Sequence, residues 1–465
     1  MSLTKATFSL INGAVANVLD YGATGDGVTD DTAAIQAAVT AVCLNTDPAT
    51  YGSNTPRLGP TELFIPAGLY KITDAIVATR SISIKGEGHS EFSEGTRIIQ
   101  STAAKDHFTI VPLAQGSSVS FTDLTLTANG GGGTGGSCIN ITRAAGACAS
   151  IRIIGCTFGT PQTFAIKIQT GDDVMIHDNL FDVSATQCIS LGTVTANDVV
   201  SNCTISRNSF YSIAQVAIAG YNVTKLIVAN NKIFPSAQRL GTFFDGFNTL
   251  PYLLENIVIE GNSFSGVNCL MKMTGVNGLV VANNNGVNLG AGTGATLSAI
   301  EFTGTCARVN VSGNVLSGSF DTKHFYDDSG GTVASSNITG NALINVSGSG
   351  IGLNCYNTTG NIGENSFTNF TNPSVSEHFY TTGNAITPGT VAAGGSYIFT
   401  KTVTGVRQGD QLQLSATSLV WPVTPVGIVV VAYASDANQM AIRYDNVTAS
   451  PIAVPAHDFG VEISR

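Results

Sequence analysis

Charged side chains are scarce in this sequence. They make up 11% of its 465 residues, against roughly 25% in ordinary soluble domains. Solvent-exposed helices rich in Glu and Lys are therefore not expected over most of the chain. Glycine is abundant instead, with 52 residues, and Asn, Ser and Thr are frequent. This composition is typical of stacked strands joined by tight turns.

Basic residues and long apolar runs are also scarce. The 21 Lys and Arg residues are outnumbered by 31 Asp and Glu residues, and no basic stripe is present, so we expect no nucleic-acid partner. The longest apolar stretch, residues 426–433, is far shorter than the roughly 20 residues of a membrane span. The first ten residues also lack the basic and apolar segments of a secretory signal. We therefore expect no membrane insertion.

Cysteine spacing excludes two common kinds of site. The nine cysteines are odd in number, and no two of them have the Cys-x-x-Cys spacing of zinc and redox sites. Several lie inside strand-like patterns, where reduced thiols serve as small core residues. We therefore expect a protein made in a reducing cytoplasm, without disulfides, a metal site or a cofactor.

Residues 17–42 contain a glycine-rich turn and then a helix. The helix is expected over 30–43, with Ala33, Ile35, Ala38, Val39 and Val42 on its apolar face. Three aspartates near its start suggest a metal site, but such acids more often cap helices and form turns. We interpret all three as caps and turn formers: Asp26, Asp30 and Asp31.

The N-terminal string VLDYGATGDGVTDDTAAIQAAV (18–39) resembles the opening segment of the pectate-lyase-like β-helix superfamily. TELFIPAGLYKIT (61–73) and SISIKGEG (81–88) resemble the segments that follow it. The resemblance implies an all-β fold, a right-handed single-stranded parallel β-helix whose N-terminal end is plugged by the helix. It does not determine the reaction, because the superfamily contains hydrolases, lyases, isomerases and proteins without activity.

The middle of the chain repeats a strand followed by Asn-x-Phe or a variant. Cys156 holds the first Asn position, and the repeat recurs every 19 to 31 residues, as in solenoids. We expect each Asn to occupy a left-handed turn and to bond the Asn of the next coil, with the residue two later stacked inside. The Asn residues of this ladder lie at 179, 208, 231, 262, 284, 314, 341, 365 and 384.

A second strand follows each Asn-x-Phe element, and the last strand of this series is HFYTT (378–382). Strand alternation places one outward side chain at an equivalent point of each coil. The predicted outward column consists of Lys167, Ser190, Ala217, Asp245, Lys272, Glu301 and Tyr326.

Residues 388–465 alternate apolar and polar side chains between turn clusters, which predicts an antiparallel β-sandwich. This part resembles the C-terminal domains of phage tail fibres and tailspikes, which hold trimers together. A carbohydrate-binding module has a similar pattern. The domains expected are a virion-attachment segment at 1–16, an N-terminal cap at 17–60, a parallel β-helix at 61–386 and the sandwich at 387–465.

The combined architecture resembles bacteriophage tailspikes. It implies a homotrimer located on the virion, attached through its N-terminus to a phage tail or baseplate protein. It also implies binding and depolymerisation of a bacterial surface polysaccharide, a capsule or an O-antigen. A polysaccharide lyase and a receptor-binding adhesin without activity are the alternatives with the same fold.

Glycoside hydrolysis needs two carboxyl groups. The outward column offers Asp245 and Glu301, with Asp327 one coil further as a third candidate. The catalytic motifs of polygalacturonases are otherwise absent, so we interpret Asp172-Asp173 as a turn. A lyase would instead use Lys272, His324 or Tyr326 as its base. The residues expected to bind substrate are Lys272, Tyr326, Arg239, Phe247, Tyr252 and His324.

Overall fold

The computed structural model describes most of the chain. The described residues are 15–45, 62–88, 95–113, 116–128, 136–143, 147–159, 163–182, 187–194, 198–211, 215–234, 241–247, 254–289, 298–318, 324–327, 332–345, 351–354, 358–363, 365–368, 380–381, 389–402, 411–415, 428–436, 439–454 and 460–464.

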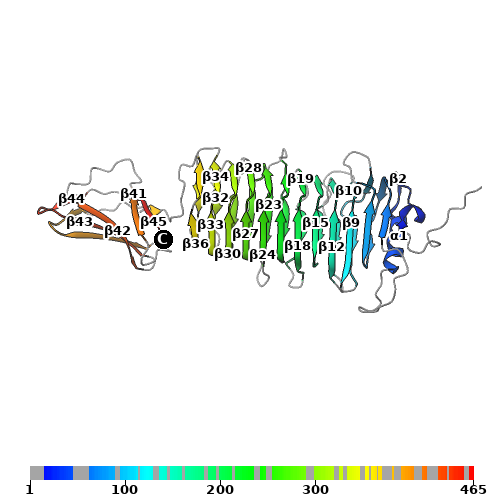
Figure 1. Cartoon of the computed structure of the whole chain (residues 1–465), viewed down its shortest axis with the longest axis horizontal. Coiled ribbons are helices and arrows are strands. Elements are labelled where there is room, and N and C mark those ends of the chain that lie inside the picture. The colour runs from blue at the N-terminus through cyan, green and yellow to red at the C-terminus, as the bar shows by residue number, and fades with distance from the viewer. Residues whose placement is uncertain are drawn as a thin grey trace, which may run out of the picture.

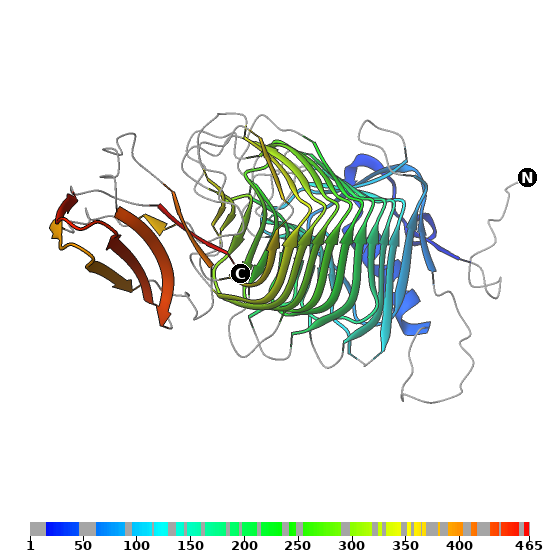
Figure 2. The ribbon, with the colours of Figure 1, turned by 60° about the vertical axis from the view of Figure 1, so that its left-hand side comes forward.

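The chain winds into a stack of coils whose strands form three parallel sheets (Figures 1 and 2). The first coil has a strand only in sheets A and B, so β1 pairs with β3 and β2 with β4. From β3 to β34, each coil contributes one strand to each sheet in turn, and each strand pairs with the strand three places later. The predicted parallel β-helix is therefore confirmed.

Sheets A and B have thirteen strands each and sheet C has eleven. Sheet A consists of β1 (Ala16–Asn17), β3 (Glu62–Ile65), β6 (Ile82–Gly86), β9 (Ser117–Thr122), β12 (Cys148–Ile154), β15 (Val174–His177), β18 (Val200–Ser206), β21 (Val223–Ala229), β24 (Glu255–Glu260), β27 (Val276–Ala282), β30 (Thr305–Ser312), β33 (Thr332–Thr339) and β36 (Thr358–Gly363). Sheet B consists of β2 (Asp26–Asp30), β4 (Gly68–Ile72), β7 (Thr96–Gln100), β10 (Thr125–Ala128), β13 (Thr157–Gly159), β16 (Leu180–Asp182), β19 (Ser209–Tyr211), β22 (Lys232–Ile233), β25 (Ser263–Ser265), β28 (Asn285–Leu289), β31 (Val315–Gly318), β34 (Ala342–Asn345) and β37 (Ser366–Thr368). Sheet C consists of β5 (Ile76–Ala78), β8 (Phe108–Ile110), β11 (Ser137–Ile141), β14 (Phe164–Ile168), β17 (Gln187–Leu191), β20 (Val216–Gly220), β23 (Thr242–Phe247), β26 (Cys269–Thr274), β29 (Ile300–Phe302), β32 (His324–Asp327) and β35 (Ile351–Asn354).

The interior of the solenoid is filled by inward side chains that stack from coil to coil. The Phe158 and Phe181 rings lie 4.9 Å apart, and those of Phe181 and Phe210 lie 4.7 Å apart, both nearly parallel. The predicted Phe stack is confirmed at these positions. The eight cysteines that lie in the described part of the chain are free and buried, as expected of thiols used as core residues.

The Asn ladder is confirmed from Asn179 to Asn365; Asn384 lies outside the described residues. Each side-chain Nδ2 donates to Oδ1 of the next Asn at 2.9–3.0 Å. The predicted left-handed turn is displaced by one residue. The residue before each ladder Asn from 179 to 341 has a φ between 55° and 66°, and the position holds Gly, Asn, Asp or Arg.

The N-terminal helix α1 (Thr32–Asn45) begins two residues later than predicted and lies at the N-terminal end of the stack (Figure 1). Ile35, Ala38, Val39 and Val42 are fully buried, whereas Ala33 is exposed and lies off the predicted apolar face. No helix within the described ranges combines the length and apolar character needed to cross a lipid bilayer.

The three aspartates near the start of α1 form the expected caps and turns. Asp26 accepts hydrogen bonds from the N–H groups of Val28 and Thr29. Asp30 accepts from the Thr32 N–H, and Asp31 accepts from the N–H groups of residues 24 and 25. Since their oxygens are engaged with the chain's own amides, these acids organise the N-terminal cap.

Beyond β37 the described strands are antiparallel, as predicted for the C-terminal part. β40 (Ser396–Thr402) and β42 (Ile428–Asp436) flank β43 (Gln439–Asn446), and β39 (Gly389–Val391) pairs with β44 (Ile452–Val454). β38 (Tyr380–Thr381) and β41 (Gln411–Ser415) flank β45 (Gly460–Ser464). The strand expected to continue the solenoid over 378–382 therefore belongs, as β38, to these antiparallel sheets.

Candidate functional site

The outward face of sheet C carries one column of side chains in register. Asp245 pairs with Lys272, and Lys272 pairs with Glu301, so these residues lie on three consecutive coils, as the sequence predicted. The column extends in both directions. Its members are Thr109, Asn140, Lys167, Ser190, Ala219, Asp245, Lys272 and Glu301, and the backbone pairing continues to Asp327 and Asn354.

Two predicted members of the column are wrong. Ala219, not Ala217, pairs with Asp245, and Asp327, not Tyr326, pairs with Glu301. Ala217 and its neighbour Ile218 are both fully buried. Two adjacent buried residues break the simple alternation of a strand, so counting in twos along β20 gives the wrong face.

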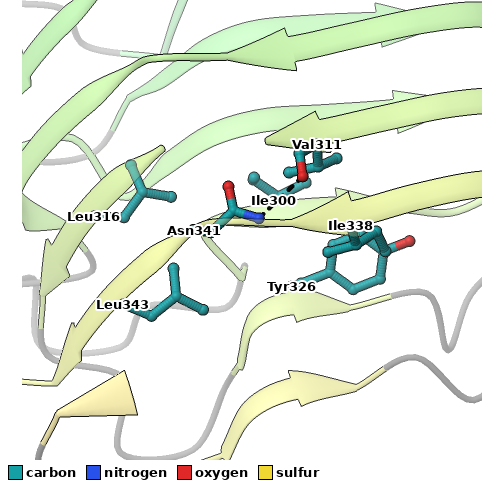
Figure 3. Close-up of a pocket in the computed structure, with 7 residues that line it drawn as sticks. All are labelled: Ile300, Val311, Leu316, Tyr326, Ile338, Asn341 and Leu343. Atoms are coloured by element: carbon teal, nitrogen blue, oxygen red, sulfur yellow. Dashed lines mark hydrogen bonds between the residues drawn. The ribbon is translucent and has the colours of Figure 1, made fainter. Parts of the chain in front are cut away.

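Tyr326 lies inside the solenoid and is only 2% exposed. Its hydroxyl lies 3.0 Å from Thr358 Oγ1, and its ring lies 5.3 Å from that of Phe302. It lines a small cavity together with apolar side chains and Asn341, whose Nδ2 donates to the Val311 carbonyl (Figure 3). Tyr326 is therefore a core residue, and its side chain is not part of the outward column.

Asp245 is a buried carboxyl group on this outward column, with 8% of its surface exposed. Its Oδ1 has no hydrogen-bond partner among the described residues. Burial raises its pKa to about 6, and the Glu301 charge adds to this rise, while the Lys272 charge opposes it. A carboxyl group with such a pKa can hold a proton near neutral pH, as a general acid must.

Lys272 and Glu301 form an ion pair beside Asp245. The distance between Lys272 Nζ and Glu301 Oε1 is 4.0 Å, and both side chains are partly buried. The Ser298 N–H donates to the other carboxylate oxygen, Glu301 Oε2, at 3.3 Å. The column therefore places a desolvated acid two coils from a carboxylate that is stabilised by an ammonium group and an amide.

An aromatic pair lies beside the acids. Phe247 follows Asp245 by two positions in β23, and its ring stacks on that of Tyr221 with centroids 5.3 Å apart and planes 11° apart. The Gln187 Nε2 donates to the Tyr221 hydroxyl at 2.8 Å. Tyr221 and Gln187 were missed from the sequence. Aligning Ala219 with Asp245 would have found Tyr221, because it then falls opposite Phe247.

Two further predicted site residues lie in β32: the expected substrate-binding residue His324 and the third candidate acid Asp327. Asp327 pairs with Glu301, and His324 pairs with Ile351. Arg239 and Tyr252 lie outside the described residues. The structure therefore brings together Asp245, Lys272, Glu301 and Phe247 among the predicted side chains.

Asp172 and Asp173 form the predicted turn, between β14 and β15. The Asp172 carboxylate accepts hydrogen bonds from Ser201 Oγ at 2.8 Å and from Asn202 Nδ2. Arg152 binds Asp173 at 2.6 Å. These partners link neighbouring coils, which assigns this pair of acids a structural role.

Solved structures similar to this chain share its solenoid. The structure of DFA-IIIase from Arthrobacter chlorophenolicus A6 in complex with GF2 has a TM-score of 0.54 and 15% identity, and covers 75% of this chain and 92% of its own. PfbA, a surface adhesin of Streptococcus pneumoniae, has a TM-score of 0.51 and 14% identity over 78% of this chain and 93% of its own. At these identities the likeness establishes the fold alone.

A third structure covers almost the whole chain. The Pseudomonas phage phi297 tailspike gp61 is 11% identical and covers 97% of this chain and 98% of its own, with a TM-score of 0.42. That score is too low to support an argument. No curated protein matches the sequence.

The sequence profile of one family matches residues 15–308, which is more than half of the chain and includes Asp245, Lys272 and Glu301. This range begins just before β1 and ends within β30, so it contains the N-terminal cap and most of the solenoid. The chain belongs to the rhamnogalacturonase A/epimerase, pectate lyase-like family.

Proposed function

We propose that this protein hydrolyses glycosidic bonds in a bacterial surface polysaccharide, with Asp245 as the general acid. The observation that carries the proposal is the state of Asp245, a buried outward carboxyl group with its pKa raised to about 6 and one oxygen without a partner among the described residues. A burial of this kind is costly to stability, and such groups concentrate at functional sites.

Glu301 serves as the second carboxylate. Two coils separate it from Asp245, and adjacent strands lie about 4.8 Å apart, so the two backbones are about 9.6 Å apart. Inverting glycosidases hold their carboxyl groups about 6.5–9.5 Å apart, which leaves room for a water. We therefore propose an inverting reaction.

In this reaction Asp245 donates its proton to the glycosidic oxygen as the bond to the sugar carbon breaks. Glu301 accepts a proton from the water whose oxygen bonds that carbon on the opposite face. Lys272 stabilises the charge of Glu301, and Asp327, one coil beyond Glu301, is the alternative second acid. The aromatic rings of Phe247 and Tyr221 offer apolar faces to the sugar.

The comparisons support a carbohydrate-active enzyme. The family is named for a rhamnogalacturonase, and one similar structure is that of DFA-IIIase. The order of helical cap, solenoid and antiparallel terminal sheets supports a tailspike as its setting, a homotrimer on the phage virion attached to the tail through its N-terminus. Light scattering tests the assembly, since a trimer has three times the 47.9 kDa subunit mass.

The activity is tested on purified bacterial capsules and O-antigens, with new reducing ends measured and the fragments analysed by mass spectrometry. Asp245→Asn and Glu301→Gln are each expected to lower turnover at least about a hundredfold, the scale of losing a general acid or base. Asp182→Asn and Glu260→Gln, on sheets B and A, are the matched controls and should keep full activity.

Two results would replace this proposal. Fragments that carry an unsaturated uronate, seen as new ultraviolet absorbance, would indicate a lyase, with Lys272 or His324 as its base. Binding of a polysaccharide without any fragments would indicate an adhesin of the same fold.

A further inference from the structure

On the N-terminal side of Asp245, the surface of sheet C carries small, polar and aromatic side chains in place of acids. Over the preceding coils the column holds the small residues Ser190 and Ala219, with Lys167 beyond them. Side chains from neighbouring positions lie beside these small residues and contact one another across the coils. Two groups of side chains, Phe164 with Lys167 and Gln187 with Tyr221 and Phe247, form a polar and aromatic surface on the coils that precede Asp245.

Some contacts along this surface lie within a coil and others join neighbouring coils. The Lys167 ammonium lies 5.2 Å from the centre of the Phe164 ring in the same strand, β14, and Phe164 pairs with Gln187 of the next coil. Gln187 donates to the Tyr221 hydroxyl at 2.8 Å, and the Tyr221 ring stacks on Phe247 in the coil of Asp245. All five side chains are partly exposed.

Two oxygens at this surface have no donor. Gln187 Oε1 and Asp245 Oδ1 are both shielded from solvent and without a partner among the described residues. An unsatisfied buried acceptor is costly and calls for an explanation such as a catalytic role or a bound donor. Sugar hydroxyls are hydrogen-bond donors of the kind that such oxygens can accept from.

Lys167 has no acid within ion-pair distance in the described part of the chain, unlike Lys272 with Glu301. Three coils separate it from Asp245, which is about 14 Å at the spacing of adjacent strands. A ligand that contacts both residues must therefore be longer than one sugar ring and must lie along the axis of the solenoid.

We infer that this surface binds the sugar chain lengthwise on the N-terminal side of Asp245, with Gln187, Tyr221 and Phe247 near the cleaved bond and Lys167 at the far end. The inference rests on the proposed function and adds to it the path and direction of the substrate. It assigns binding to Tyr221, Gln187 and Lys167, which contact substrate but transfer no proton.

The test measures binding separately from cleavage. The full-length Glu301→Gln protein is applied to an array of purified capsular and O-antigen polysaccharides, and Tyr221→Ala, Tyr221→Phe and Lys167→Gln are added to it. Tyr221→Ala should weaken binding about fivefold, the scale of a lost aromatic contact. Tyr221→Phe keeps the stacked ring and should retain most of the affinity. A loss of binding in Tyr221→Ala but not in Tyr221→Phe would therefore be due to the loss of the ring.

The sheet B face supplies matched controls. Tyr211 and Phe234 form a similar stacked pair there, with centroids 4.4 Å apart and planes 4° apart, and Lys232 is an exposed lysine on the same sheet. Tyr211→Ala and Lys232→Gln should leave binding within about twofold of the parent, the range expected of surface changes away from a site.

Fragment length gives the second readout. Lys167→Gln should weaken binding of long oligosaccharides of the cleaved polymer and leave the shortest bound fragments unaffected. Equal binding by all variants to a polymer that the wild type cuts would overturn the inference and leave the proposed function standing. Failure of the wild-type protein to bind or cut any polymer would overturn both.

Discussion

The Asn ladder and the outward column of sheet C are both rows of polar side chains in register from coil to coil. In the ladder, each amide of Asn208 to Asn341 receives hydrogen bonds from the coil before it and donates to the coil after it. In the column, Asp245 and Asn140 each keep one buried oxygen without a partner in the described residues, and Lys272 pairs with Glu301 at only 4.0 Å.

The difference lies in how each row satisfies its own hydrogen bonds. An Asn is both donor and acceptor, so identical residues can satisfy one another. A carboxylate only accepts, so Asp245 depends on donors from elsewhere. The ladder thus stabilises the solenoid, whereas the column stores unsatisfied groups that a ligand can use. The following predictions test this contrast.

Breaking the ladder should have the largest effect on stability. Asn231→Ala removes the acceptor of the Asn208 N–H and Asn208 Nδ2, both bonded at 3.0 Å. Two buried donors without partners cost about 2–5 kcal/mol of the free energy of unfolding. Urea denaturation measures the loss. Asn310→Ala, which removes the partly buried bond from Asn337 Nδ2 on the outer surface, is the control and should cost less than about 1 kcal/mol.

Neutralising Asp245 should increase the free energy of unfolding, whereas breaking the ladder lowers it. Its folded-state pKa of about 6 lies above the ordinary 3.8, so the folded protein binds the proton more tightly, and stability is lost as pH rises through this window. Asp245→Asn should therefore stabilise the protein by about 1–3 kcal/mol at pH 8. Thermal denaturation at pH 8 and at about pH 3.5 tests this, since the gain should vanish at the lower pH.

The rate should follow the protonation of Asp245. Because the general acid must be protonated, activity should level off well below pH 6 and fall as pH rises, by about tenfold per pH unit once the pH is well above 6. Lys272→Met removes a charge that lowers the pKa of Asp245, so the fall should move to higher pH. A fall that stays in place in this variant would mean that another group controls the rate.

The smallest effect is expected in the turns before the ladder residues. Arg207 has a φ of 55°, and its guanidinium pairs with the half-exposed Asp178 at 2.8 Å. Arg207→Gly loses an exposed ion pair worth about 0–1 kcal/mol and relieves a left-handed conformation that costs roughly 1–2 kcal/mol. The stability should change by less than about 1 kcal/mol, because Gly also gives the unfolded chain more freedom.

The ladder could be predicted from the sequence because the same residue, Asn, recurs at the equivalent position of successive coils. Asn-x-Phe recurs whatever the loop lengths, so the positions from Asn179 to Asn365 were found without counting along strands. The residue type in the outward column of sheet C changes from one coil to the next, so no repeated residue marks it in the sequence. Asp245, Lys272 and Glu301 can be aligned only by their place in successive strand patterns, and the pairing of β23, β26 and β29 confirms that register.

The rest of the site could not be predicted from alternation alone. Phe243 and Phe244 are both fully buried, as are Ala217 and Ile218. Such pairs change which residues of a strand face outward. The predicted column therefore contained Ala217 in place of Ala219, and Tyr221 was not predicted. Unpaired oxygens such as Gln187 Oε1 depend on neighbours 34 residues away in sequence, and no local pattern reports them.

The spacing of the ladder has a consequence for how this protein can diversify. Successive ladder residues are bonded although between 22 and 31 positions separate them along the chain. Insertions and deletions between them leave the bonded amides in place, because each coil closes on the same inner contact. Descendants can therefore lengthen or replace the segments between ladder residues while keeping the same hydrogen-bonded sheets, so a change of the outer surface requires no new scaffold.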